Sequence, residues 1–230
     1  MPPATPLPVP DDARELLVFG GSFDPPTRAH RECAVEARDA AMPHAWLVLV
    51  PAARSPHKVD APEASDADRI RMLELAFSGA ERTAIWTDEL DRAAEDPAAP
   101  SYAIETIRRL ASLRPRATLR LLIGADQALA FCRWKEHRQL AELAEPLVML
   151  RAPAESPEDL IARLAQTGAW SPAELDDWRG RIAPVPVRAG SATEARGLLA
   201  SLRARNKKDL AALLHPEVLE VILARDLYRG

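Results

Sequence analysis

The sequence predicts an α/β fold in which a parallel sheet carries helices on both faces. Short apolar runs bounded by glycine or proline, such as 16–19 (LLVF) and 45–50 (AWLVLV), are typical of buried parallel strands. Segments with helical spacing lie between these runs, and the two kinds of segment alternate along the chain, as strand–helix–strand crossovers require. Ligands of such sheets bind outside the carboxyl ends of the strands, where the strand order reverses.

Five apolar runs are expected to form the strands of this sheet. They are 16–19, 45–50, 83–86, 119–123 and 146–150. A sixth run, 182–187 (IAPVPV), is predicted to be an edge strand, because its prolines cannot donate ladder hydrogen bonds.

Helices are predicted between and after these strands. Two of them are expected over 28–41 and 216–227. Three more are expected to begin at Ser65, which would act as the N-cap, at Ser101, and at Thr193. After Ser65, two aspartates in the first turn favour a helix start because they face the positive end of the helix dipole.

The length of 230 residues suits one domain, and 47% hydrophobic residues suffice for its core. We expect a disordered, proline-rich leader over 1–15 and a single domain over 16–230. The polar stretch 152–180, which contains Trp170 and Trp178, is expected to be a surface insertion with some helix.

The overall charge and the cysteines exclude several classes of protein. A net charge of −4 and a pI near 5.8 argue against a general nucleic-acid binder, which needs a basic face. Cys33 and Cys132 form no CxxC pair, so neither a zinc site nor a disulfide is predicted. Residues 1–15 do not resemble a signal peptide, and no apolar run approaches the ~20 residues that a membrane span needs. We therefore expect a cytoplasmic protein that does not act at a membrane.

The strongest motif is the segment 20–30 (GGSFDPPTRAH), between the first strand and the first helix. Gly20 and Gly21 let the backbone approach a ligand closely, and the helix that follows directs its positive end at the same place, which favours phosphate. His30 lies in the first turn of that helix, where its ring can face phosphates. The segment matches neither GxxxxGK(S/T) nor GxGxxG. The alternative is an ordinary turn with a surface histidine.

A second phosphate-binding motif is predicted at 190–196 (GSATEAR). Ser191 or Thr193 can cap a helix whose first N–H groups bind an anion, and Arg196 in the first turn offers a planar fork of donors. The alternative is a plain helix cap with a solvent-exposed arginine.

Together these motifs resemble GG(T/S)FDPxHxGH and ISxTxxR of the (H/T)xGH nucleotidyltransferases. The resemblance implies a Rossmann-like sheet of the nucleotidyltransferase type, in which His30 contacts the phosphates of ATP and stabilises the transition state. Thr27 takes the first histidine position of the motif, Ala29 replaces its usual glycine, and Gly190 replaces the usual isoleucine. The ATP-binding residues that it implies are Gly20, Gly21, Ser22, Phe23, Thr27, His30, Gly124, Asp126, Ser191, Thr193 and Arg196.

The middle of the chain resembles bacterial nicotinate-nucleotide adenylyltransferases. The matching segments are 51–58 (PAARSPHK), 69–76 (RIRMLELA), 88–90 followed by 100–102 (PSY), 122–126 (LIGAD) followed by 133–135 (RWK), and 227–229 (LYR). The resemblance covers nearly the whole chain from Leu16, apart from the insertion.

This resemblance implies a pocket for the acceptor nucleotide. Its residues are His57, Lys58, Ser101, Tyr102, Ala103, Trp134 and Lys135. Trp134 would stack on the pyridine ring, as the face of a tryptophan allows, although a core tryptophan is the alternative. Asp126 would lie near the ribose or adenosine. Ala103 and Lys135 replace the usual threonine and tyrosine, and Lys135 is hypothesised to contact the nicotinate carboxylate.

The reaction that the resemblance implies is attack by the phosphate of nicotinate mononucleotide on the α-phosphorus of ATP, which gives deamido-NAD and pyrophosphate. Catalysis then consists of positioning and charge neutralisation, by His30, Lys58 and Arg196. Mg²⁺ would be held mainly by phosphate oxygens, so no metal site of the protein itself is predicted. ATP and nicotinate mononucleotide are the expected partners, and a homo-oligomer is compatible with the sequence.

Three alternatives remain open at this point. Another (H/T)xGH enzyme, such as a pantetheine-phosphate adenylyltransferase or a cytidylyltransferase, fits residues 27–30 but fits the segments at 101–102 and 134–135 poorly. A nucleotide-binding protein without turnover would explain Ala29 and Gly190. A fragment of an aminoacyl-tRNA synthetase fits less well, because the chain is acidic and lacks a KMSKS-like loop.

Overall fold

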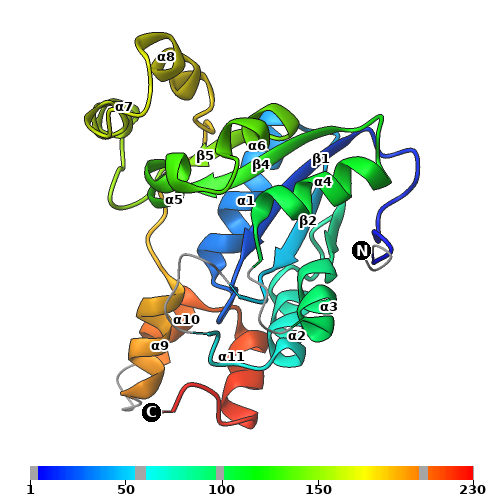
Figure 1. Cartoon of the computed structure of the whole chain (residues 1–230). Helices are drawn as coiled ribbons and strands as arrows, with labels where there is room; N and C mark the ends of the chain where they lie inside the picture. The colour runs from blue at the N-terminus through cyan, green and yellow to red at the C-terminus, as the bar shows by residue number, and fades with distance from the viewer. Residues whose placement is uncertain (1–4, 55–60, 97–100, 202–206, 230) are drawn as a thin grey trace.

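Five parallel strands form one sheet in the order β3-β2-β1-β4-β5 in the computed structural model, which describes residues 5–54, 61–96, 101–201 and 207–229 (Figure 1). The strands are β1 (Glu15–Gly21), β2 (Trp46–Pro51), β3 (Thr83–Ile85), β4 (Thr118–Gly124) and β5 (Glu145–Met149). The predicted fold class and the five predicted strands are confirmed. The strand order reverses between β1 and β4.

Helices cover both faces of the sheet and divide the core in two. One core contains Leu17 and Phe19 of β1 and is covered by α1 (Arg28–Ala41), α2 (Asp66–Ala76), α9 (Ala192–Ala200), α10 (Lys207–Leu213) and α11 (Pro216–Ala224). The other contains Leu16 and Val18 and is covered by α4 (Ala103–Leu113), α5 (Ala125–Ala130), η1 (Phe131–Arg133), α6 (His137–Leu143), α7 (Pro157–Gln166) and α8 (Pro172–Gly180). This alternation along β1 is the period-2 pattern of a strand buried on both faces.

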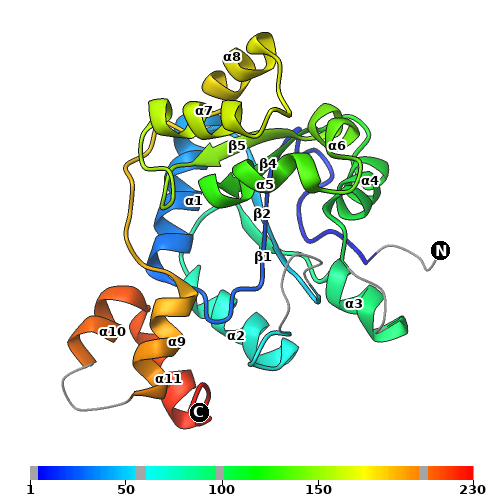
Figure 2. The same ribbon diagram turned by 60° about the vertical axis from the view of Figure 1, so that its left-hand side comes forward.

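The two groups of late helices lie at opposite ends of the molecule. In both views α7 and α8 lie at one end, whereas α9, α10 and α11 gather at the other (Figures 1 and 2). None of the helices in the described ranges is long and apolar enough to cross a membrane.

Local signals predicted α1 and α2 well. The predicted helix 28–41 coincides with α1, and the Oγ of Ser65 caps α2 by accepting a hydrogen bond from the N–H of Asp68 at 3.1 Å. The start predicted at Ser101 is wrong, because α4 begins at Ala103 and Tyr102 is its N-cap residue. The backbone N–H of Ser101 instead bonds the carbonyl of Arg54 at 3.0 Å, which keeps this residue in the preceding loop.

The edge strand predicted over 182–187 is wrong. Only Ile182 pairs with β5, through a single parallel bridge to Val148, and the segment then leaves the sheet. The prolines at 184 and 186 lack the N–H groups that would continue the ladder. Another helix, α3 (Asp88–Glu95), was not predicted, because its sequence is polar and offers few apolar positions.

The leader expected to be disordered over 1–15 is packed from Thr5 onward. Leu7 and Val9 are each 8% exposed and join the core under α4. The indole Nε1 of Trp86 donates to the carbonyl of Thr5 at 3.0 Å, and Arg114 donates to the carbonyl of Val9 at 3.0 Å. Two apolar side chains spaced by prolines thus give this short segment enough burial to stay in place.

The segment 152–180 contains helix, as expected, but it is more than a surface insertion. Leu160 and Leu164 of α7 and Trp178 of α8 are fully buried. They belong to the same core as residues of β4 and β5. The two helices therefore extend this core near the β5 edge of the sheet.

The packing of the leader is testable by Leu7→Ala. Removing a side chain that is 92% buried should lower the free energy of unfolding by about 2 kcal/mol. Leu223→Ala, at a position that is 37% exposed, is the matched control and should cost less than about 0.5 kcal/mol. Chemical denaturation measures both, and equal small losses would show that the leader is not packed.

Candidate active site

The candidate site lies at the carboxyl ends of β1 and β4, where the strand order reverses. Gly20 and Gly21 end β1, and Gly124 ends β4. Crevices at such points are the usual ligand sites of open parallel sheets. The predicted position of the site therefore agrees with the topology. His57 and Lys58, which were predicted to reach it from the loop after β2, lie outside the described residues.

The loop after β1 is shaped by the ring of Phe23. This residue is 2% exposed and has a φ of 48°, a left-handed conformation that non-glycine residues rarely adopt. A Cβ at Gly21 would lie 3.2 Å from the ring, so a larger residue there would press on it. The ring packs edge-on against Phe19, with centroids 5.4 Å apart, and 5.5 Å from the ring of His30. Phe23 thereby holds His30 beside the end of β1.

Thr27 and His30 form a reciprocal capping box at the start of α1. The Oγ1 of Thr27 accepts from the backbone N–H of His30, and the Nδ1 of His30 accepts from the backbone N–H of Thr27 at 3.0 Å. Because a backbone N–H can only donate, Nδ1 acts as the acceptor in this contact. Nε2 is the ring nitrogen that can donate to a phosphate oxygen in this arrangement.

The carboxylate of Asp24 joins three segments of the chain. Its oxygens accept from the backbone N–H groups of Glu63 at 2.8 Å and Ala64 at 3.1 Å, just before α2, and from the hydroxyl of Tyr228 at 2.7 Å. Asp24 is 5% exposed and Tyr228 is 3% exposed. Burial and the bond to Asp24 raise the pKa of Tyr228 well above its ordinary value, so its hydroxyl keeps its proton and remains a donor.

Arg69 of α2 stabilises the same loop through hydrogen bonds to its backbone. Its side chain is completely buried and donates to the carbonyls of Ser22 at 2.7 Å and Ala52 at 2.8 Å, which follow β1 and β2. An ion pair with Asp66 at 2.6 Å balances its charge. The arginine of the RIRMLELA segment thus fixes two strand ends relative to α2.

The second motif reaches the first through Arg196. Ser191 is the N-cap of α9 and accepts from the N–H of Glu194 at 3.1 Å, as predicted for a capping residue. Arg196 donates to the backbone carbonyl of Asp24. Thr193 is exposed in the first turn of α9. The two motifs, more than 150 residues apart in sequence, therefore meet in the structure.

The structure explains why glycine occupies position 190, where the (H/T)xGH family usually has isoleucine. Its φ is 112°, a conformation that favours glycine. A Cβ there would also lie 2.8 Å from the side chain of Leu213 in α10. Gly190 is accordingly compatible with a well-formed motif.

A cavity of about 310 Å³ lies between the two motifs. We call it the α1 cavity, and its lining residues are Arg28, Ala29, Glu32, Val187, Arg188, Ala189, Gly190, Ala212 and Leu213. Arg188 forms ion pairs with Glu32 at 3.3 Å and with Glu36, so its charge is already balanced. The half-buried Ala29 adds one methyl group to the wall.

The end of β4 presents Asp126 together with an arginine that sequence reasoning missed. The guanidinium of Arg151, just after β5, bonds the carboxylate of Asp126 at 2.8 Å. A Cβ on Gly124 would lie 2.5 Å from Arg151 Nε, so this arginine lies directly over the end of β4. The sequence pattern could have indicated Arg151 as a site residue, because it follows the fifth apolar run. It therefore lies at the carboxyl end of a strand, like other predicted site residues.

The predicted acceptor residues come from the starts of α4 and α6. Ser101, Tyr102 and Ala103 are half-buried at the start of α4. Trp134, just after η1, is also half-buried, with its ring centroid 5.3 Å from that of Phe131, so it is not a fully buried core tryptophan.

Lys135 bridges these two segments. Its Nζ lies 2.8 Å from a carboxylate oxygen of Glu105 and 4.4 Å from the centre of the Tyr102 ring. The ion pair raises the pKa of Lys135. The hypothesised contact of Lys135 with a carboxylate of the ligand must therefore compete with Glu105.

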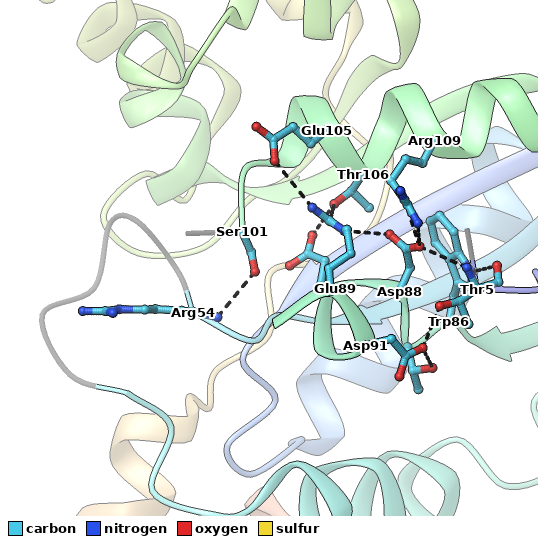
Figure 3. A network of polar contacts seen from close by, with 12 residues as sticks. Thr5, Arg54, Trp86, Asp88, Glu89, Asp91, Ser101, Glu105, Thr106 and Arg109 are labelled. Atoms are coloured by element: carbon cyan, nitrogen blue, oxygen red, sulfur yellow. Dashed lines mark hydrogen bonds and ion pairs between the residues drawn. The ribbon is translucent and has the colours of Figure 1, made fainter. Parts of the chain in front are cut away.

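A buried polar network ties α3 to α4 beside Ser101 (Figure 3). Asp88 is fully buried and pairs with Arg92 at 3.0 Å and Arg109 at 2.9 Å. Thr106 donates to Glu89 at 2.6 Å, and burial raises the pKa of Glu89. The network joins α3 to α4, the helix that begins in the acceptor segment 101–103, and so gives the matching residues 88–90 a structural role.

Tyr228→Phe tests the three-way junction at Asp24. Losing a hydrogen bond to a buried carboxylate should lower the free energy of unfolding by about 2 kcal/mol. Tyr102→Phe, at the chain's other tyrosine, is half-buried and serves as control with a change below about 0.5 kcal/mol. Urea denaturation gives both values, and a Tyr228→Phe protein as stable as the control would contradict the junction.

Known proteins resemble this chain in sequence over nearly its whole length. Residues 18–178 match the model of the cytidylyltransferase-like family. A relative from Chromobacterium violaceum named "Probable nicotinate-nucleotide adenylyltransferase" is 34% identical over 92% of this chain and 97% of its own. A relative of the same name from Pseudomonas paraeruginosa is 36% identical over 94% and 98%.

Solved structures show the same fold. The Plasmodium falciparum nicotinic acid mononucleotide adenylyltransferase complexed with NaAD superposes with a TM-score of 0.68 at 17% identity, over 94% of this chain and 97% of that one. At that identity the likeness concerns the fold alone. The motifs at the carboxyl end of β1 and the amino-terminal end of α9, the family match and the full-length relatives together place this chain in the cytidylyltransferase-like family, among the nicotinate-nucleotide adenylyltransferases.

Proposed function

We propose that the protein transfers the adenylyl group of ATP to nicotinate mononucleotide in NAD biosynthesis. The observation that carries the proposal is the contact of Arg196 with the Asp24 carbonyl, which joins both phosphate-binding motifs at the switch point of the sheet. Relatives with that name match the chain over more than nine-tenths of its length, which supports the same activity here.

The reaction needs no nucleophile from the protein. A phosphate oxygen of nicotinate mononucleotide forms a bond to the α-phosphorus of ATP, and the bond from that phosphorus to the bridging oxygen of the β-phosphate breaks. Pyrophosphate leaves with the electron pair, and deamido-NAD is the other product. The protein contributes positioning and stabilisation of the charge that develops on the phosphoryl oxygens.

Two described side chains are suited to stabilise that charge. His30, held at the start of α1 by the Thr27 cap, can donate from Nε2, and Arg196 adds a guanidinium from α9. Lys58 is proposed as the third cation, on the strength of the sequence motif alone. The α1 cavity, bounded by both motifs, is the proposed place of the adenosine.

Mg²⁺ is proposed as a cofactor that reaches the site bound to phosphate oxygens. No group of three or more His, Cys, Asp or Glu side chains suited to a metal occurs in the described part of the chain. Asp126, the carboxylate at the end of β4, is paired with Arg151. When bound, Mg²⁺ would neutralise phosphate charge, and phosphate oxygens and water would supply most of its ligands.

The acceptor is proposed to bind between the starts of α4 and α6. Trp134 would stack on the pyridine ring, and the segment 101–103 would line the other side. The proposal also places the protein in the cytoplasm without nucleic acid as a partner. The two described cysteines, Cys33 and Cys132, are free thiols, in keeping with a reducing compartment.

Pyrophosphate release from ATP and Mg²⁺ tests the reaction. Nicotinate mononucleotide, nicotinamide mononucleotide and phosphopantetheine are offered side by side. Preference for nicotinate mononucleotide supports the proposal. Turnover of phosphopantetheine instead would keep the phosphate site and discard the Trp134 pocket, and no turnover with any acceptor would favour a binding protein without catalysis.

His30→Ala should lower kcat by at least about 100-fold, because it removes one donor to the charge that develops on phosphate. His44→Ala, at an exposed histidine after α1, is the control and should leave kcat unchanged. Steady-state rates measured with nicotinate mononucleotide, after a thermal melt confirms that both variants fold, decide the matter. A loss below tenfold would remove His30 from its role.

Lys135→Ala should lower the preference for the acid over the amide acceptor by about tenfold, since a charge-assisted hydrogen bond to the nicotinate carboxylate would be lost. The preference is the ratio of kcat/KM for nicotinate and nicotinamide mononucleotide. Arg133→Ala removes an exposed cation two residues away and serves as control. An unchanged ratio would mean that Glu105 retains Lys135 when the acceptor binds.

A further inference from the structure

A continuous set of aromatic side chains connects α8 to the proposed acceptor pocket. We call it the aromatic cluster, and its members are Trp134, Phe131, Trp178, Trp170 and His137. Phe131 lies between Trp134 and Trp178, with ring centroids 5.3 Å and 5.5 Å away. Trp170 packs edge-on against Trp178 at 5.3 Å and against His137 at 5.7 Å. The cluster therefore runs from the pocket to the end of the segment 152–180.

Burial increases from the pocket into this cluster. Trp134 is half-buried, whereas Phe131 and Trp178 are both 0% exposed. Interiors are packed as densely as organic crystals, so a fully enclosed ring cannot move without displacing its neighbours. The position of the Trp134 ring is thus coupled to that of Trp178 through Phe131.

The helix α8, which carries Trp178, and its neighbour α7 are fixed to the sheet independently of the pocket, and Trp170 lies in the loop between them. Leu160 and Leu164 anchor α7 in the core at 0% exposure. Arg181 follows α8, lies 5.2 Å from the centre of the Trp178 ring and forms an ion pair with Glu145 of β5 at 3.5 Å. These contacts hold Trp178 in place, so the surface that it packs against Phe131 is fixed.

We propose that α8 positions the Trp134 ring, through Trp178 and Phe131, and thereby sets the affinity for the aromatic base of the acceptor nucleotide. Trp178 is then a positioning residue that does not touch the substrate. The inference rests on the proposed function, because it takes Trp134 as the platform for the pyridine ring. It assigns a role to the segment 152–180, which the sequence alone did not.

A purely structural Trp178 would behave differently. Loss of core packing alone would lower stability and the amount of folded enzyme, with both Michaelis constants unchanged. A positioning role changes the Michaelis constant of one substrate only, because ATP is proposed to bind on the other side of the site, near α1 and α9. The ratio of the two Michaelis constants therefore distinguishes the alternatives.

The test compares Trp178→Leu and Trp178→Phe with Trp134→Leu. Trp178→Leu should raise the KM for nicotinate mononucleotide about tenfold, since part of the stacking on Trp134 is lost, and change the KM for ATP less than twofold. Trp178→Phe keeps an aromatic edge against Phe131 and should restore most of the affinity. Trp134→Leu should raise the same KM at least as much as Trp178→Leu.

Trp86→Leu is the matched control, because Trp86 is equally buried in the same core but bonds the leader at Thr5. It should lower stability and leave both Michaelis constants unchanged. A Trp178→Leu protein with unchanged acceptor KM overturns the inference. If that variant fails to fold, Trp170→Leu removes the ring that packs against Trp178 and should also raise the acceptor KM; an unaltered acceptor KM in that variant overturns the inference as well. Wild-type protein that does not use nicotinate mononucleotide, or Trp134→Leu with unaltered acceptor KM, would instead overturn the proposed function or its pocket.

Discussion

The buried carboxylate of Asp24 receives three hydrogen bonds from two distant parts of the chain, and the phosphate-binding loop depends on them. A charge placed at 5% exposure is unfavourable unless its oxygens are bonded. Here the backbone before α2 and the hydroxyl of Tyr228 supply the donors. The loop after β1, the start of α2 and the end of the chain must therefore assemble together, because each leaves a buried polar group unsatisfied without the others.

The two faces of the sheet carry different parts of the proposed reaction. Helices α1, α2 and α9–α11 cover one face and surround the phosphate motifs and the α1 cavity. Helices α4–α8 cover the other face and carry the proposed acceptor residues around Trp134. The reversal of strand order between β1 and β4 brings both groups to one edge of the sheet. Transfer between two nucleotides requires such an arrangement, since each substrate needs its own surface and both must reach one phosphorus atom.

Sequence reasoning succeeded where the deciding interactions are local. The strands, α1 and the cap of α2 follow from patterns within a few residues, and the phosphate motifs lie at strand and helix ends that those patterns define. It failed where distant contacts decide. The leader is ordered by Trp86 and Arg114, and the bond between Asp24 and Tyr228 spans 204 residues. No local pattern contains such contacts, so the packing of the leader and the role of Asp24 required the structure.

A crystal structure of the protein with deamido-NAD would test the central claim most directly, because it shows both proposed subsites at once. We expect the pyrophosphate bridge of the product between His30 and Arg196, the adenosine in the α1 cavity, and the pyridine ring against Trp134. A pyridine ring bound away from Trp134, or a bridge out of reach of His30 and Arg196, would contradict that claim.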